Sequence, residues 1–183
     1  MVGAVAQGGK KMFGFLKPKP APDGPVVFVL DAEVAVPAQR LYDLLDWASP
    51  DNAKRLQGEQ VNRLGDRSDR FELIMRSMPD LQILLTVTDQ DPPGLYGYES
   101  ELRPAVGKLK SSHELYRIEA TGADSCRVEY TNTVEFQPGL TLKQFENEVG
   151  MMSIASHNSL KKLMLQAEEG TEAVEAANRR IVA

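Results

Sequence analysis

Glu114 and Asn132 form a polar pair that the sequence places on the inner face of a predicted sheet. A three-residue turn at 122–124 joins their strands and sets the two residues opposite each other. Tyr116 and Tyr130 form the next pair on the same face. A carboxylate in such a place can transfer a proton or bind the polar end of a ligand, which makes Glu114 the one candidate catalytic residue. The alternative is a hydrogen-bond cluster that satisfies its own polar groups.

The other reactive side chains do not form a recognisable site. His113 points outward from the same strand, and His157 lies on the flank of a predicted helix, so both are expected at the surface. Cys126 has no base beside it and is expected to be a small buried residue. These residues supply no metal-binding set, and the chain has no phosphate-binding glycine-rich loop. We therefore expect no metal, no cofactor and no nucleotide-dependent chemistry.

Composition limits the class of protein. The chain has 183 residues, of which 42% are hydrophobic, which suits one globular domain with a sizeable core. A net charge of -5 argues against binding to nucleic acid. A single cysteine fits a reducing compartment, and no apolar run is long enough to cross a membrane. The expected location is the cytoplasm.

Residues 1–25 are predicted to be a flexible tail, because glycine and proline recur throughout it. The tail is basic, and its segment 10–19 mixes four lysines with Phe13, Phe15 and Leu16. This segment is compatible with a weak contact with a membrane surface, but a tail that packs on the domain or has no role is the favoured interpretation. Met12 is an alternative start of the chain.

A long helix is predicted over 141–169. Thr141 is a suitable N-cap and Gly170 a suitable C-cap. One face of this helix is apolar, with residues at steps of three and four. Its members are Leu142, Phe145, Val149, Met152, Ser156, Leu160, Leu163 and Ala167. Residues 171–183 show little apolar periodicity and are predicted to be a frayed helical extension.

The region before this helix is predicted to be rich in strands. A strand begins at Val26, a helix begins at Pro37, and a second short helix ends near Gly58. Six strands follow, over 59–65, 69–77, 81–90, 95–103, 108–121 and 125–137. Loop lengths give these hairpins registers that align one continuous apolar face, and the opposite face is charged. The long helix is the element available to cover the apolar face.

This order resembles the START-like, or SRPBCC, superfamily. The resemblance also rests on residues 34–45, which read Val-Ala-Val-Pro-Ala-Gln-Arg-Leu-Tyr-Asp-Leu-Leu and are similar to the opening of its members. The superfamily includes birch-pollen-allergen proteins, lipid-transfer domains and bacterial polyketide cyclase/dehydrase proteins. Over 26–170 the resemblance implies an α+β helix-grip fold, in which a curved antiparallel seven-stranded sheet wraps around the C-terminal helix. It implies an internal cavity for an apolar molecule such as a lipid or polyketide, and no catalytic residue.

The inner face of the sheet and the helix stripe supply the expected lining of that cavity. The candidates are Phe71, Leu73, Met75, Leu85, Tyr98, Glu114, Tyr116, Tyr130, Asn132, Phe145, Val149 and Met152. The alternative is that these side chains simply fill the core.

Three functions follow from this interpretation. The favoured one is non-catalytic binding or transport of a hydrophobic small molecule. The second is a cofactor-free enzyme of the cyclase/dehydrase type, with Glu114 or a tyrosine transferring a proton. The third is a protein- or membrane-interaction module. The sequence does not indicate the ligand or the oligomeric state.

Overall fold

The computed structural model describes residues 19–182, which fold as one strand, two short helices, six strands and two further helices. The elements are β1 (Val26–Val34), α1 (Ala38–Leu45), α2 (Ala53–Leu56), β2 (Gln60–Arg63), β3 (Arg70–Met75), β4 (Met78–Asp91), β5 (Leu95–Arg103), β6 (Leu109–Gly122), β7 (Ser125–Phe136), α3 (Leu142–Glu169) and α4 (Thr171–Val182). The predicted order is confirmed, with one helix added at its end. Most of the predicted basic segment 10–19 lies outside the described residues.

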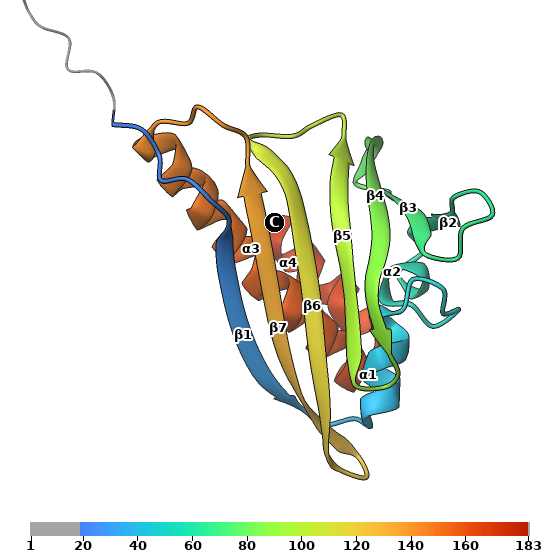
Figure 1. The fold of residues 1–183 in the computed structure, drawn as a ribbon. Coiled ribbons are helices and arrows are strands. Elements are labelled where there is room, and N and C mark those ends of the chain that lie inside the picture. Colours follow the sequence, from blue (N-terminus) through green and yellow to red (C-terminus); the bar gives the residue numbers. More distant parts are fainter. Residues whose placement is uncertain (1–18, 183) are drawn as a thin grey trace, which may run out of the picture.

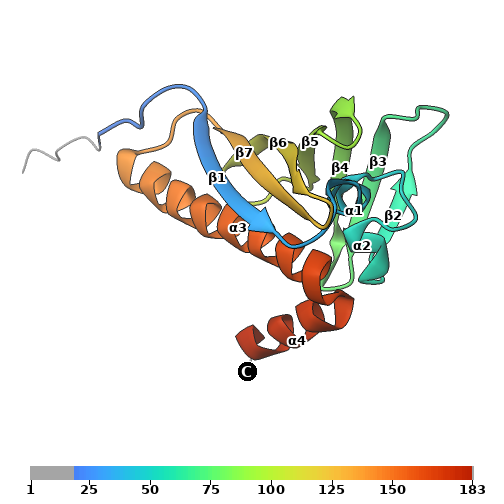
Figure 2. The ribbon, with the colours of Figure 1, turned by 90° about the horizontal axis from the view of Figure 1, so that it is seen from below.

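The seven strands form one antiparallel sheet in the order β1-β7-β6-β5-β4-β3-β2. The sheet is curved, and α3 crosses its concave side (Figures 1 and 2). β1 and β2 remain at the two edges, so the sheet does not close into a barrel. The concave side is therefore covered by helices rather than by other strands.

The register predicted for β6 and β7 is confirmed. Glu114 pairs with Asn132, and Tyr116 pairs with Tyr130. The turn expected at 78–80 is wrong, because β3 ends at Met75 and β4 already begins at Met78. A register shift next to Met75 leaves Pro79 opposite no ladder partner. A proline has no N–H to donate, so an irregularity of the ladder is where it can be accommodated.

Helix α3 begins and ends where the sequence predicts. Thr141 forms a capping box with Gln144, and Gly170 follows the last turn with a φ of 88°. Leu160 and Leu163, in the second half of the helix, are buried in the core. α3 lies against β1, β7 and α1 (Figure 2). Its C-terminal half therefore faces the centre of the molecule.

Asn52 and Gln166 hold the short helix α2 in place. Asn52 is 1% exposed, and its Oδ1 accepts a hydrogen bond from the Lys54 N–H at 3.0 Å. Its Nδ2 donates to the carbonyls of Leu44 and Leu45 at 3.2 and 3.3 Å. Gln166 on α3 donates to the Ala53 carbonyl at 3.1 Å. α2 is thereby bonded to both α1 and α3.

Residues 171–182 form a separate helix, α4, which agrees with the predicted helical extension but is packed on the chain rather than frayed. Val174 is completely buried, and Gln166 Nε2 donates a hydrogen bond to Thr171 Oγ1 at 3.2 Å. The burial of one apolar residue and this contact hold α4 against the rest of the chain (Figure 2).

We expect Asn52→Ala to lower the free energy of unfolding by about 2 kcal/mol, because it removes a helix cap and two buried hydrogen bonds. Urea unfolding followed by circular dichroism measures this loss. Asn62→Ala, on the exposed strand β2, is the control and should change stability by less than about 0.5 kcal/mol. Equal effects of the two substitutions would contradict the role given to Asn52.

Candidate ligand-binding pocket

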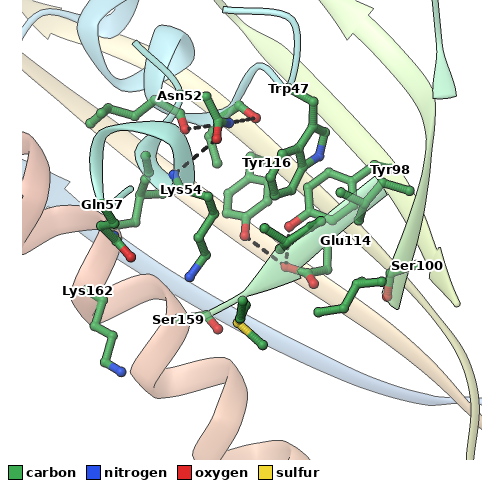
Figure 3. A pocket seen from close by; sticks show the side chains of 18 of the residues that line it. Trp47, Asn52, Lys54, Gln57, Tyr98, Ser100, Glu114, Tyr116, Ser159 and Lys162 are labelled. Atoms are coloured by element: carbon green, nitrogen blue, oxygen red, sulfur yellow. Dashed lines mark hydrogen bonds between the residues drawn. The ribbon is translucent and has the colours of Figure 1, made fainter. Parts of the chain in front are cut away.

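A pocket of about 420 Å³ lies between the concave face of β3–β6, the helices α1 and α2, and the C-terminal half of α3 (Figure 3). This volume is within the range of sites that bind small organic molecules. Its apolar wall consists of Leu44, Leu45, Trp47, Ala53, Leu73, Met75, Ile83, Leu85, Leu102, Ala155 and Leu163. Its other side chains are Asn52, Lys54, Gln57, Tyr98, Ser100, Glu114, Tyr116, Asn158, Ser159, Lys162 and Gln166.

The carboxylate of Glu114 binds three tyrosine hydroxyls at the sheet side of the pocket. Its Oε2 atom accepts hydrogen bonds from Tyr98 at 3.0 Å, from Tyr116 at 2.9 Å and from Tyr130 at 2.9 Å. These donors come from β5, β6 and β7, which are adjacent in the sheet. Glu114, Tyr98 and Tyr116 also line the pocket (Figure 3). We refer to the four residues as the Glu114 cluster.

The tyrosines of the Glu114 cluster remain hydrogen-bond donors over the ordinary pH range. Burial raises the pKa of Tyr98, Tyr116 and Tyr130 above the usual value of 10.0, and the nearby charge of Glu114 raises it further. A deprotonated phenol could not donate to the carboxylate. The cluster is thus a stable arrangement of one acceptor and three donors.

The aromatic side chains beside the cluster connect it to α1. The ring of Trp47 contacts that of Tyr98 at 5.3 Å between centroids, edge to face. The Tyr96 hydroxyl accepts a hydrogen bond from the Trp47 backbone N–H at 2.9 Å and donates to Asp46 at 3.3 Å. The end of α1 is therefore fixed to β5, which places the Trp47 ring on the pocket wall.

Two lysines line the pocket on the helix side. Lys54 comes from α2 and Lys162 from α3, opposite the strand that carries Glu114 (Figure 3). Burial lowers the pKa of Lys54, and the positive charge of Lys162 lowers it further. No ion pair within residues 19–182 includes either lysine. Two lysines without an ion-pair partner in that range therefore border the same cavity.

The structure brings together half of the residues that the sequence proposed for the cavity. Those that line the pocket are Leu73, Met75, Leu85, Tyr98, Glu114 and Tyr116. The others lie elsewhere: Phe71 is buried in the core, Tyr130 reaches the pocket only through Glu114, and Asn132 donates to Ser156 at 3.0 Å. They were misplaced because the inner face of the sheet is wider than the pocket.

The residues proposed from the first half of α3 do not reach the pocket. Phe145 packs edge to face on Phe136, and Val149 and Met152 are half-buried there. This half of the helix crosses the sheet near β1 and β7 (Figure 2), whereas the pocket lies beside β3–β6. An apolar stripe gives the face of a helix but not the angle at which it crosses a sheet.

Sequence reasoning missed the polar side of the pocket. Asn158, Lys162 and Gln166 follow one another at steps of four, so they share a face of α3. This spacing of polar residues is present in the sequence, but the apolar stripe beside it was the basis for predicting the cavity lining. Lys54 had no such signal, because α2 has a single turn and its position depends on Asn52 and Gln166.

The other reactive residues stay outside the pocket. His113 lies on the outer face of the sheet, where its Nε2 is 3.0 Å from Thr88 Oγ1. His157 is exposed and hydrogen-bonded to the Ser153 carbonyl, and Cys126 is fully buried. Within residues 19–182 there is no group of His, Cys, Asp and Glu suited to a metal ion, and no helix of that range is long and apolar enough to cross a membrane.

Replacing Glu114 tests the cluster. Glu114→Leu leaves three phenol hydroxyls without their acceptor, and we expect it to lower the free energy of unfolding by about 3 kcal/mol. Glu114→Gln keeps an acceptor oxygen and should cost about 1 kcal/mol. Urea unfolding measures both values. Glu119→Leu, at an exposed position of the same strand, is the control, and a Glu114→Leu loss no larger than that of Glu119→Leu would contradict the cluster's structural role.

Alkaline pH should destabilise the protein through the same tyrosines. Their pKa is raised in the folded chain, so their contribution to stability is complete below about pH 10 and is lost as pH rises above it. The loss should reach about 1.4 kcal/mol per pH unit for each tyrosine. Urea unfolding between pH 8 and pH 11, paired with tyrosinate absorbance, measures it. Tyr130→Phe should make the free energy of unfolding less dependent on pH. Reversible ionisation of these tyrosines near pH 10 in the folded protein would contradict the prediction.

The fold is similar to that of several solved structures, although the sequence itself has no close match. The sequence matches no protein-family model, and it matches no curated protein. The aromatase/cyclase Zhui from Streptomyces sp. R1128 is 15% identical, with a TM-score of 0.57 over 86% of this chain and 96% of that chain. Norcoclaurine synthase from Thalictrum flavum, in complex with dopamine and hydroxybenzaldehyde, is 11% identical, with a TM-score of 0.55 over 89% and 94%. The protein Ara h 8.0201 is 12% identical, with a TM-score of 0.58 over 84% and 97%. These likenesses, with the seven-stranded sheet and the long C-terminal helix, show that the chain has the α+β helix-grip fold.

Proposed function

We propose that this protein binds a hydrophobic small molecule in the pocket between the sheet and α3. The observation that carries the proposal is the pocket itself, which measures about 420 Å³ and has apolar side chains from β3, β4, β5 and α1 along its wall. The apolar side chains along this wall lack packing partners on the cavity side, which is unfavourable. A ligand restores those contacts.

A solved structure of the same fold supports the same proposal. By analogy, the norcoclaurine synthase of the same fold holds dopamine and hydroxybenzaldehyde, which are small aromatic molecules.

A cofactor-free enzyme of the cyclase/dehydrase type is the second candidate. Two observations favour it: Glu114, Tyr98 and Tyr116 line the pocket, and the fold is similar to that of an aromatase/cyclase. All three hydroxyls of the cluster donate to Oε2 of Glu114, so Oε1 is the oxygen left to take a proton from a substrate. Conversion of a bound molecule that Glu114→Gln abolishes without loss of binding would favour the enzyme over the carrier.

Filling the pocket should weaken binding. Met75 lines the pocket, and Met75→Trp places a larger side chain in the same space. We expect the variant to bind N-phenyl-1-naphthylamine, a neutral apolar probe, at least about tenfold more weakly, a loss of about 1.4 kcal/mol. Equilibrium dialysis measures the affinity, and circular dichroism checks that the variant is folded.

Met78→Trp is the matched control, because Met78 is 43% exposed and does not line the pocket. Mass spectrometry of small molecules released from the purified protein gives an independent test. The proposal would be abandoned if the folded wild-type protein bound no apolar probe and released no small molecule, or if both tryptophan variants bound the probe as the wild type does.

A further inference from the structure

The pocket carries opposite charges on its two walls. The carboxylate of Glu114 stands on the sheet, and the ammonium groups of Lys54 and Lys162 stand on α2 and α3 (Figure 3). The carboxylate is engaged by the three tyrosine hydroxyls of its cluster. The two lysines are the cationic side chains of the pocket, and they lie on the wall opposite this carboxylate.

No carboxylate within residues 19–182 forms an ion pair with either lysine, although Glu59 and Glu114 attract Lys54 from a greater distance. Glu59 is engaged elsewhere: it accepts a hydrogen bond from the Arg76 N–H at 2.7 Å and lies 3.9 Å from the Arg76 guanidinium. Lys54 and Lys162 repel each other, and this repulsion is part of what lowers the pKa of Lys54. An anion placed between them would replace the repulsion with two attractions.

Hydrogen-bonding side chains surround the same part of the pocket. Asn158 and Ser159 are exposed and lie within one turn of Lys162 on α3, and all three line the cavity. Beyond them the wall is apolar, with Leu73, Ile83 and Leu85 on adjacent strands. A ligand that matches this surface has one charged end and one apolar end.

We infer that the ligand is an amphipathic molecule with an anionic head group, a carboxylate or a phosphate, that lies between Lys54 and Lys162 while its apolar part follows the wall of β3 and β4. This inference rests on the proposed function, since it names the chemical class of molecule that the pocket binds. Glu114, on the opposite wall, repels the head group and so fixes the direction in which the ligand lies.

Titration calorimetry with decanoate, decyl phosphate and 1-decanol tests the inference. We expect decanoate or decyl phosphate to bind at least about tenfold more tightly than 1-decanol, because a charge-assisted hydrogen bond is stronger than a neutral one. The ratio of the affinities for decanoate and decyl phosphate identifies which head group the pocket prefers. Raising the salt concentration should lower the affinity for either anion and leave the affinity for 1-decanol unchanged.

Substitution of the lysines locates the head group. Lys54→Met and Lys162→Met each remove one charge with little change in side-chain length. Each substitution should lower the affinity for the anion about tenfold without changing the affinity for 1-decanol. Lys161→Met is the control, because Lys161 is exposed on the same helix and does not line the pocket. It should change neither affinity.

The possible failures are distinguishable. Equal affinity for the alcohol and both anions, unchanged in Lys54→Met and Lys162→Met, would overturn this inference and leave the proposed function standing. A loss of anion binding in Lys161→Met as large as in Lys162→Met would also overturn it. Binding of neither N-phenyl-1-naphthylamine nor any decyl compound would overturn the proposed function itself.

Discussion

The hydrogen bonds between Glu114 and three tyrosines fix the registers of the strands that form the pocket. Tyr98, Tyr116 and Tyr130 stand on three adjacent strands, and their hydroxyls meet at one carboxylate oxygen. A slip of one residue in any of these strands would turn a hydroxyl or the carboxylate toward solvent. The cluster therefore stabilises one pairing of β5, β6 and β7 against its alternatives, and the position of every pocket residue on those strands depends on that pairing.

The helices complete the pocket by a different kind of interaction. Asn52 and Gln166 are polar, nearly inaccessible to solvent, and bonded to backbone carbonyls of other segments. They hold α2 across the gap between α1 and α3 where a single helical turn would not be stable alone. The two halves of α3 have separate roles, because the first half packs near the edge of the sheet and the second half forms the wall of the pocket.

The sequence was informative wherever local spacing determines structure. The three-residue turn at 122–124 was sufficient to place Glu114 opposite Asn132, and the caps at Thr141 and Gly170 were sufficient to bound α3. It was uninformative about relations between distant segments. The crossing angle of α3 and the position of Lys54 depend on contacts between residues about a hundred positions apart, such as the bond of Gln166 to Ala53. Apolar periodicity therefore identified the sheet side of the pocket but not its charged helix side.

The aromatic rings near the pocket form one continuous series. Contacts link Tyr42 to Tyr96, Tyr96 to Tyr98, Tyr98 to Tyr116 and Tyr116 to Tyr130, with the only tryptophan, Trp47, against Tyr98. This series contains all five tyrosines of the chain. These short separations favour energy transfer from the tyrosines to Trp47, whose ring borders the cavity. Tryptophan fluorescence of this chain is consequently a report from one wall of the pocket.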